Sequence, residues 1–213
     1  MDAPPLPLVD PVAGLALRRW RPVDAPALAA AWTDGEIAGP ERVDPGDAPA
    51  VAERWIRGWE ARLAADLSVD LVVGPVDGDE VWGEVGLVRL RLRPGAAPGA
   101  LGEGGDRGEG GGRGDPAERT VWELGWWLAP ARRGRGLAAP AVALLLGWLD
   151  DAGPGVPVVA RIRPGNLAST RVAERLGLVR RGAFDDEHDL WVRPRAAGRR
   201  GPAPHPGPAS GEV

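Results

Sequence analysis

Apolar and polar residues along this chain change repeatedly between the spacing of a strand and the spacing of a helix. Short apolar or alternating runs bounded by Gly, Pro or Asp predict strands. These runs cover 15–20, 67–73, 80–92, 120–128, 156–162, 178–184 and 187–192. Apolar residues three or four positions apart predict helices. They cover 24–32, 47–65, 137–149 and 166–177. Elements in this order predict an α/β (α+β) domain built on a mixed sheet.

Three segments lack the apolar residues that a folded core requires. Residues 94–118 are mostly Gly, Pro and charged residues, and we expect a flexible loop inside the domain. Residues 194–213, rich in Arg, Pro and Gly, predict a disordered tail, and 1–12 a disordered N-terminus. The folded domain then spans 13–193, which is long enough for a single core.

Composition excludes several kinds of chemistry. The 213 residues include no cysteine, which removes thiol nucleophiles, disulfides and cysteine metal sites. Only His188 and His205 could supply imidazole, so we expect no metal site. A formal net charge of −4 argues against a nucleic-acid partner, although all 26 basic residues are arginine. With no long apolar run and no signal-peptide pattern, we expect no membrane association and a cytoplasmic protein.

The run from Glu123 to Ala138, ELGWWLAPARRGRGLA, joins a predicted strand to a predicted helix through a turn of Gly and Arg. A helix start has unpaired N–H groups and the positive end of a dipole equivalent to about half a charge, so it attracts anions. The glycines of this turn leave room for a phosphate group, and its arginines add positive charge. The pattern predicts a site for a phosphate-bearing ligand.

Three segments of the chain resemble the GNAT superfamily of acetyl-CoA-dependent N-acetyltransferases. The sequence RGRGLA at 133–138 matches the superfamily signature R/Q-x-x-G-x-G/A. GWWLAP at 125–130, and PGNLAS at 164–169 followed by VAERLGL at 172–178, are similar to the RimJ/RimL type, which acetylates protein N-termini and other amines. The resemblance implies a GNAT fold, with a central mixed and twisted sheet of six to seven strands flanked by about four helices.

The resemblance also implies how the co-substrate acetyl-CoA would bind. Its pyrophosphate would lie on the turn and helix start, which comprise Arg133, Gly134, Arg135, Gly136, Leu137 and Ala138. Its pantetheine arm would run along the strand containing Trp127 and Leu128, as an extra strand would, and a strand N–H there would stabilise the oxyanion that develops from the thioester carbonyl. Asn166 matches a family asparagine on the pantetheine side, and it is also an ideal residue to cap a helix.

Acetylation of an amine needs a base, because most amines are protonated at neutral pH. Glu123, in the strand that would carry the thioester, is the first candidate, and Glu84 on the neighbouring strand is the second. Either could instead be an exposed or paired carboxylate. Many family members protonate the leaving thiolate with a tyrosine; this chain has none, so water or Ser169 would serve. The RimJ/RimL type usually has a glutamate early in the helix, where this chain has Ala139-Pro140. The resemblance therefore says less about how the acceptor binds than about how the coenzyme binds.

These features predict an N-acetyltransferase that uses acetyl-CoA and transfers the acetyl group directly in a ternary complex, as a monomer or homodimer. The acceptor would be a primary amine, on a small molecule or at a protein N-terminus. Two alternatives stay open. Gly134-x-Gly136-x-x-Ala139 also fits a dinucleotide fingerprint, which with Arg161 and Arg163 would indicate an NADP-binding oxidoreductase. The other alternative is a catalytically silent GNAT fold that binds acyl-CoA.

Overall fold

A computed structural model describes residues 3–34, 37, 44–92, 119–152 and 155–194. These residues form one mixed sheet, in the strand order β1-β2-β3-β4-β5-β6-β8-β7. The strands are β1 (Leu8–Asp10), β2 (Leu15–Arg18), β3 (Ser68–Pro75), β4 (Gly83–Leu92), β5 (Arg119–Leu128), β6 (Val158–Ile162), β7 (Val179–Ala183) and β8 (Asp189–Arg193). Every neighbouring pair is antiparallel except β5 and β6, which are parallel. The predicted mixed sheet is confirmed.

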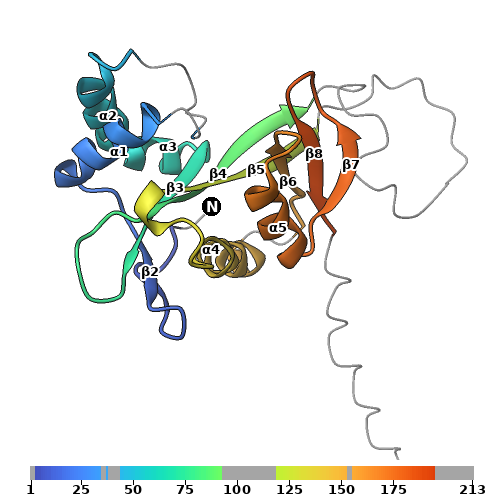
Figure 1. The fold of residues 1–213 in the computed structure, drawn as a ribbon, viewed down its shortest axis with the longest axis horizontal. Helices are drawn as coiled ribbons and strands as arrows, with labels where there is room; N and C mark the ends of the chain where they lie inside the picture. Colours follow the sequence, from blue (N-terminus) through green and yellow to red (C-terminus); the bar gives the residue numbers. More distant parts are fainter. Residues whose placement is uncertain (1–2, 35–36, 38–43, 93–118, 153–154, 195–213) are drawn as a thin grey trace, which may run out of the picture.

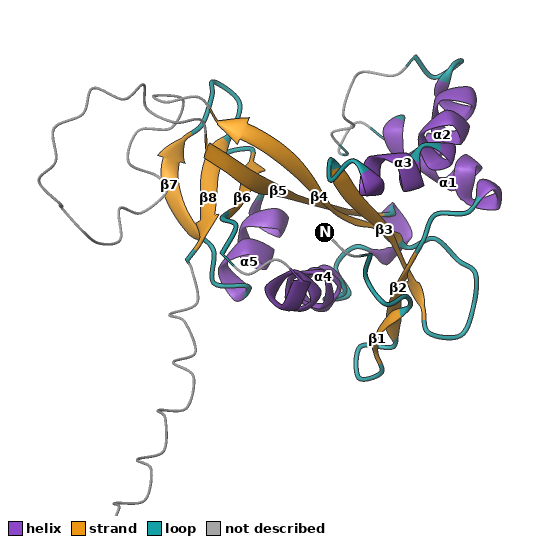
Figure 2. Ribbon diagram, turned by 180° about the vertical axis from the view of Figure 1, so that it is seen from behind, coloured by secondary structure: helices purple, strands orange, loops and turns teal. Residues whose placement is uncertain are grey.

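Helices cover both faces of this sheet. They are α1 (Ala25–Trp32), α2 (Ala48–Arg57), α3 (Trp59–Ala64), α4 (Ala138–Ala152) and α5 (Leu167–Arg175), with short 3-10 turns η1 (Pro22–Asp24) and η2 (Pro130–Arg132). The first three helices lie over one face, and α4 and α5 lie over the other (Figures 1 and 2). The single helix predicted over 47–65 is two helices, because Gly58, a poor helix former, separates α2 from α3.

The N-terminal segment differs from its prediction. The sequence indicated disorder up to residue 12, but Leu8–Asp10 pair antiparallel with β2. Leu6 and Leu8 pack against the main core, and the Asp10 carboxylate accepts hydrogen bonds from two backbone N–H groups of the turn that follows. The sheet therefore has eight strands rather than six to seven. The predicted loop 94–118, and all but the first residue of the predicted tail 194–213, lie outside the described residues.

Side chains on the two faces of the sheet follow from the strand registers. On the face covered by α4, successive strands place apolar residues side by side, such as Val69, Leu87 and Leu124, and these belong to the main core together with Leu145 of α4. The opposite face lies against α3, since the Trp59 indole N–H donates to the backbone carbonyl of β3 at 2.7 Å. This second face carries most of the polar residues discussed below.

The two parallel strands separate toward their carboxyl ends. Strands β5 and β6 pair only at Trp122 with Val158 and at Glu123 with Val159. Strand β5 nevertheless continues to Leu128, paired with β4 throughout, and β6 continues along β8. Among the described residues, therefore, no strand pairs with this edge of the carboxyl-terminal half of β5.

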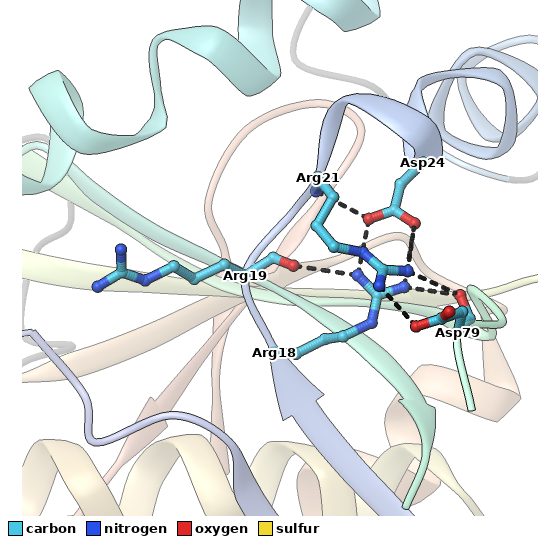
Figure 3. A network of polar contacts seen from close by, with 5 residues as sticks. All are labelled: Arg18, Arg19, Arg21, Asp24 and Asp79. Carbon is cyan, nitrogen blue, oxygen red and sulfur yellow. Dashed lines mark hydrogen bonds and ion pairs between the residues drawn. The ribbon is translucent and has the colours of Figure 1, made fainter. Parts of the chain in front are cut away.

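A network of arginines and aspartates joins the end of β2 to the turn between β3 and β4 (Figure 3). Asp24 is buried, and its two carboxylate oxygens accept hydrogen bonds from the Arg18 guanidinium at 2.7 and 3.0 Å. The Arg21 backbone N–H also donates to Asp24, and the Arg21 guanidinium pairs with Asp79 at 2.5 Å. Burial acts to raise the pKa of Asp24, but these hydrogen bonds outweigh it and hold the pKa below its ordinary value.

Candidate active site

The turn between β5 and α4 presents a run of unpaired backbone N–H groups. Gly134 and Gly136 have φ values of +72° and +75°, a conformation that glycine adopts readily and other residues avoid. Within the described part of the chain, the N–H groups from Gly134 to Ala139 donate no hydrogen bond to protein atoms. They precede a helix of fifteen residues, whose dipole adds positive potential. This geometry suits a phosphate group.

The two arginines that the sequence assigned to phosphate have different surroundings. The Arg133 guanidinium turns back toward the sheet, where it donates to the Leu128 carbonyl at 2.9 Å and to Asp34 at 2.7 Å. Its side chain thus holds the turn against β5 and the segment after α1. Arg135 is exposed, and no described residue forms an ion pair with it. Arg135 is therefore the better candidate for contact with a phosphate group.

The open edge of β5 carries backbone groups suited to an extended ligand. The Trp122 N–H donates toward β6, to the Pro157 carbonyl, and the Ala129 N–H donates toward β4, to the Trp82 carbonyl. Because backbone groups alternate in direction along a strand, the N–H and C=O of Trp126 must face the opening. The backbone of Trp127 faces β4 instead. The sequence had singled out Trp127, whereas the strand register points to Trp126.

A gap lies over Gly125 on the face of the sheet under α1–α3. Gly86 of β4 lies opposite Gly125 of β5. A Cβ atom added at Gly125 would have no neighbour within 4 Å, so open space lies above the sheet here. The adjacent pairs on the same face are Glu84 with Trp127 on one side and Val88 with Glu123 on the other. Both predicted carboxylates therefore flank the same gap, beside the open edge of β5.

Glu84 is half-buried, and its carboxyl oxygen Oε2 is wholly buried with no hydrogen-bond partner among the described residues. Burial raises the pKa of Glu84 well above its usual value, and the negative charge of Asp70 adds to this effect. The positive charge of Arg62 opposes both. A carboxylate with a raised pKa beside an open space is suited to accept a proton from a ligand in that space.

Glu123 is held by an ion pair. The Arg161 guanidinium of β6 donates to both of its carboxylate oxygens, one of them at 3.1 Å and the other closer. Arg161 also lies 4.0 Å from Asp185 in the turn between β7 and β8, and its guanidinium stacks over the Phe184 ring. Glu123 thus has the paired-carboxylate arrangement that the sequence left open as an alternative to a base.

The residues predicted near the pantetheine arm lie at the start of α5. The Asn166 side chain accepts a hydrogen bond from the Ser169 backbone N–H at 3.0 Å, so Asn166 does cap the helix. Because parallel strands end at the same edge of a sheet, α5 begins at the end of β6 near the start of α4. Ser169 is half-buried there in the first turn of α5.

Three residues of the site were missed from the sequence. Asp70 interrupts the otherwise apolar run VDLVV, and a charge in such a strand signals a buried polar contact. Gly86 and Gly125 interrupt two neighbouring strands, and glycine inside a strand often marks a close approach or an open site. Their direct pairing depends on strand register, which the sequence does not reveal.

Membrane-spanning helices and metal-binding clusters are both absent from the described residues. No helix among them has the length and apolar character that crossing a bilayer requires. None of their His, Asp and Glu side chains gather in groups of three or more that could hold a metal ion.

Comparison with known proteins places these features in a family. A sequence model of the acetyltransferase (GNAT) domain matches residues 15–179. The fold is similar to that of an acetyltransferase from Agrobacterium tumefaciens, at 22% identity over 84% of this chain and 89% of that one, with a TM-score of 0.58. It is also similar to the ribosomal-protein-S5-alanine acetyltransferase from Vibrio fischeri, at 18% identity over 84% and 92%, with a TM-score of 0.60. A third similar structure is Mycobacterium smegmatis RimJ in complex with CoA-disulfide, at 21% identity over 84% and 81%, again with a TM-score of 0.60.

Proposed function

Because the chain belongs to the GNAT family and is an acetyltransferase, we propose that it transfers the acetyl group of acetyl-CoA directly to a primary amine in a ternary complex. The observation that carries this proposal is the opening at the end of β5. Its edge offers unpaired backbone groups, a turn with unpaired N–H groups follows it in the chain, and Gly125 leaves space beside it. One ligand with a phosphate end and an extended arm fits this arrangement.

The coenzyme site would be formed mainly by backbone groups. The N–H groups from Gly134 to Ala139 would hold the pyrophosphate, with Arg135 adding positive charge. The N–H and C=O of Trp126 would hold the extended arm as a further strand does. Acetyl-CoA supplies the activated thioester. A backbone N–H on the open edge of β5 would stabilise the charge that develops on the carbonyl oxygen.

We assign the base to Glu84 in preference to Glu123. A base must accept the proton of the acceptor ammonium, and burial raises the pKa of Glu84, which increases its affinity for a proton. Both carboxylate oxygens of Glu123 accept hydrogen bonds from Arg161, so this carboxylate is already engaged in an ion pair. Both side chains flank the gap at Gly125, so an amine placed there lies close to either.

Release of the thiolate does not require a strong acid. A thiol with a pKa of about 8.5 leaves as an anion without much penalty, so water can deliver the proton. Ser169 is the hydroxyl that the chain offers at the start of α5. Direct transfer is also in keeping with a chain that has no cysteine to carry an acetyl group.

The acceptor would approach the gap from the face under α1–α3. The similar Vibrio fischeri enzyme is a ribosomal-protein-S5-alanine acetyltransferase, which supports a protein N-terminus as the first acceptor class to test. Small-molecule amines form the second class. The acidic side chains around Gly125 favour an acceptor that arrives as a cation in either case.

Two measurements test this function. Thermal unfolding is followed with acetyl-CoA, CoA and NADPH, since a ligand stabilises only the fold that binds it. We expect the midpoint to rise with the first two ligands and not with NADPH. Acetyl transfer is then measured with peptides of varied N-terminus and with small amines. No stabilisation by millimolar acetyl-CoA, or no transfer to any amine, would overturn the proposal.

A further inference from the structure

A buried polar group lies beneath α3, next to the gap but outside the residues assigned so far. Asp70 on β3 is only 5% exposed, and its Oδ2 accepts a hydrogen bond from the Ser68 hydroxyl at 2.6 Å. The Arg62 guanidinium of α3 donates to the same hydroxyl at 3.2 Å and lies 3.7 Å from Asp70 Oδ2. Arg62 is itself fixed by the Trp55 carbonyl, to which it donates at 2.7 Å.

This group lies on the same face of the sheet as Glu84, on the neighbouring strand. Asp70 pairs with Gly86, and the next pair on this face joins Val72 to Glu84, so Asp70 and Glu84 are diagonal neighbours on adjacent strands. A Cβ atom at Gly86 would lie 2.9 Å from Asp70 Oδ1. Only glycine at position 86 therefore leaves room for the Asp70 carboxylate beside Glu84.

Such an arrangement is a poor way to stabilise a fold. Burying two carboxylates with one guanidinium costs desolvation that apolar residues of the same size avoid. Neighbouring positions of β3 are buried valine and leucine, which would fill the same space. The charges instead act on Glu84, since Asp70 raises its pKa and Arg62 lowers it.

We propose that Asp70 and Arg62 are positioning residues of the acetyl transfer, which act through Glu84 and set the pH above which Glu84 accepts a proton from the acceptor amine. This inference rests on the proposed function and assigns the control of its base. Neither residue touches the reacting atoms. Their opposite charges, held on either side of Ser68, push the proton affinity of Glu84 in opposite directions.

Among the described residues, the other charged side chains near Glu84 on this face are engaged elsewhere. Arg18 of β2 lies in the same row as Glu84, one strand beyond Val72, but its guanidinium binds Asp24. Glu123 of β5 lies beyond Gly125 and binds Arg161. Trp127, which pairs with Glu84 on the same side of the gap, carries no charge. Asp70 and Arg62 are therefore the charges that control Glu84.

The test is the dependence of kcat/KM on pH in Asp70→Asn and Arg62→Gln. If deprotonated Glu84 is required, activity rises with pH through the pKa of Glu84. Asp70→Asn removes a negative charge, so the anion of Glu84 is favoured and the rise moves to lower pH, by about 1 unit. Arg62→Gln removes a positive charge, so the rise moves to higher pH. Arg62→Lys, which keeps the charge, restores the rise toward its original position.

Controls separate this effect from general damage. Asp77→Asn and Arg57→Gln remove the same charges at exposed positions, and we expect neither to move the profile. Displacements in the same direction, or none, would overturn the inference. If Asp70→Asn does not fold, the comparison of Arg62→Gln with Arg62→Lys carries the test alone. Glu84→Gln distinguishes a wrong role for Asp70 and Arg62 from a wrong base assignment. If Glu84 is not the base, this variant keeps full activity.

Discussion

Gly86 and Gly125 lie directly opposite each other on β4 and β5, and an added Cβ atom would meet different surroundings at each. A side chain at Gly86 would collide with the Asp70 carboxylate, whereas one at Gly125 would enter open space. The first glycine makes room for a buried charge, and the second leaves room for a ligand. Because the two glycines are paired, the Asp70 carboxylate and the open space at Gly125 lie next to each other on the same face of the sheet.

The space above Gly125 gives the first prediction. Gly125→Val adds a Cβ atom that has no neighbour within 4 Å, and a β-branched residue suits a strand, so we expect the free energy of unfolding to stay equal or rise by about 0.5–1 kcal/mol. The same side chain fills the acceptor gap, so we expect kcat/KM for acetyl transfer to fall at least about 10-fold. One misplaced methylene group in a binding site changes the binding of the transition state by about 1–3 kcal/mol. Chemical denaturation and steady-state kinetics measure the two effects.

Gly147→Ala is the matched control, because Gly147 is exposed on α4 and its added Cβ also meets nothing. It raises stability by about 0.5–1 kcal/mol and leaves acetyl transfer as it was. Equal transfer by Gly125→Val and the wild type would show that no substrate occupies the gap.

Gly86→Ala is predicted to act on stability. Its Cβ would approach Asp70 Oδ1 to 2.9 Å, and the buried carboxylate cannot move far under α3. Overpacking of this kind costs about 1–3 kcal/mol of unfolding free energy, which urea denaturation would measure. An unchanged midpoint would mean that Asp70 is free to turn away.

We predict that replacing Arg135 weakens acetyl-CoA binding, whereas replacing Arg133 lowers the stability of the fold. Arg135→Gln leaves the unfolding midpoint unchanged and weakens acetyl-CoA binding about 5-fold, the value of one exposed charge contact of about 1 kcal/mol. Arg133→Gln loses hydrogen bonds to Leu128 and Asp34, so it lowers the unfolding free energy by about 1–2 kcal/mol. Calorimetric titration and thermal unfolding check both variants. The reverse pattern would place Arg133 on the phosphate instead.

The Asp24 network is predicted to give stability that depends on pH. The pKa of Asp24 is lowered in the folded protein, so its carboxylate stabilises the fold at pH values above its unfolded pKa of about 4. This stabilisation is lost as the pH falls through the pKa of Asp24 in the folded protein. Asp24→Asn therefore costs about 1.5–3 kcal/mol at pH 7, and the deficit shrinks below pH 4. Denaturation curves at pH 7 and pH 3 measure it. If Asp24→Asn loses the same unfolding free energy at both pH values, the charge of Asp24 is not the cause of the loss.

The fold followed from the sequence where local signals were strong. The strand–turn–helix unit from Glu123 to Ala138 and the cap at Asn166 depend on residues close together in the chain, and both are found. The strand β1 was missed because it is short and its apolar residues lie among prolines.

The candidate site depended on contacts between distant residues, and these were harder to predict. Glu123 pairs with Arg161, 38 positions away, so its role as an ion-pair partner could not be separated from that of a base. The gap at Gly86 and Gly125 requires the register of β4 against β5. The sequence assigned the side chain of Arg133 to phosphate. In the structure it contacts Leu128 and Asp34, and Asp34 lies 99 positions away in the chain.

Glu84→Gln and Glu123→Gln together test the central claim, that this acetyltransferase takes the proton of its acceptor amine on Glu84. Rates of acetyl transfer from acetyl-CoA are measured from pH 6 to pH 9.5 in both variants and the wild type. We predict that Glu84→Gln loses about 100-fold, the typical contribution of a general base, together with the rise in rate with pH. Glu123→Gln keeps that rise and loses far less. A full rate in Glu84→Gln, or loss of the rise in Glu123→Gln alone, would contradict the claim.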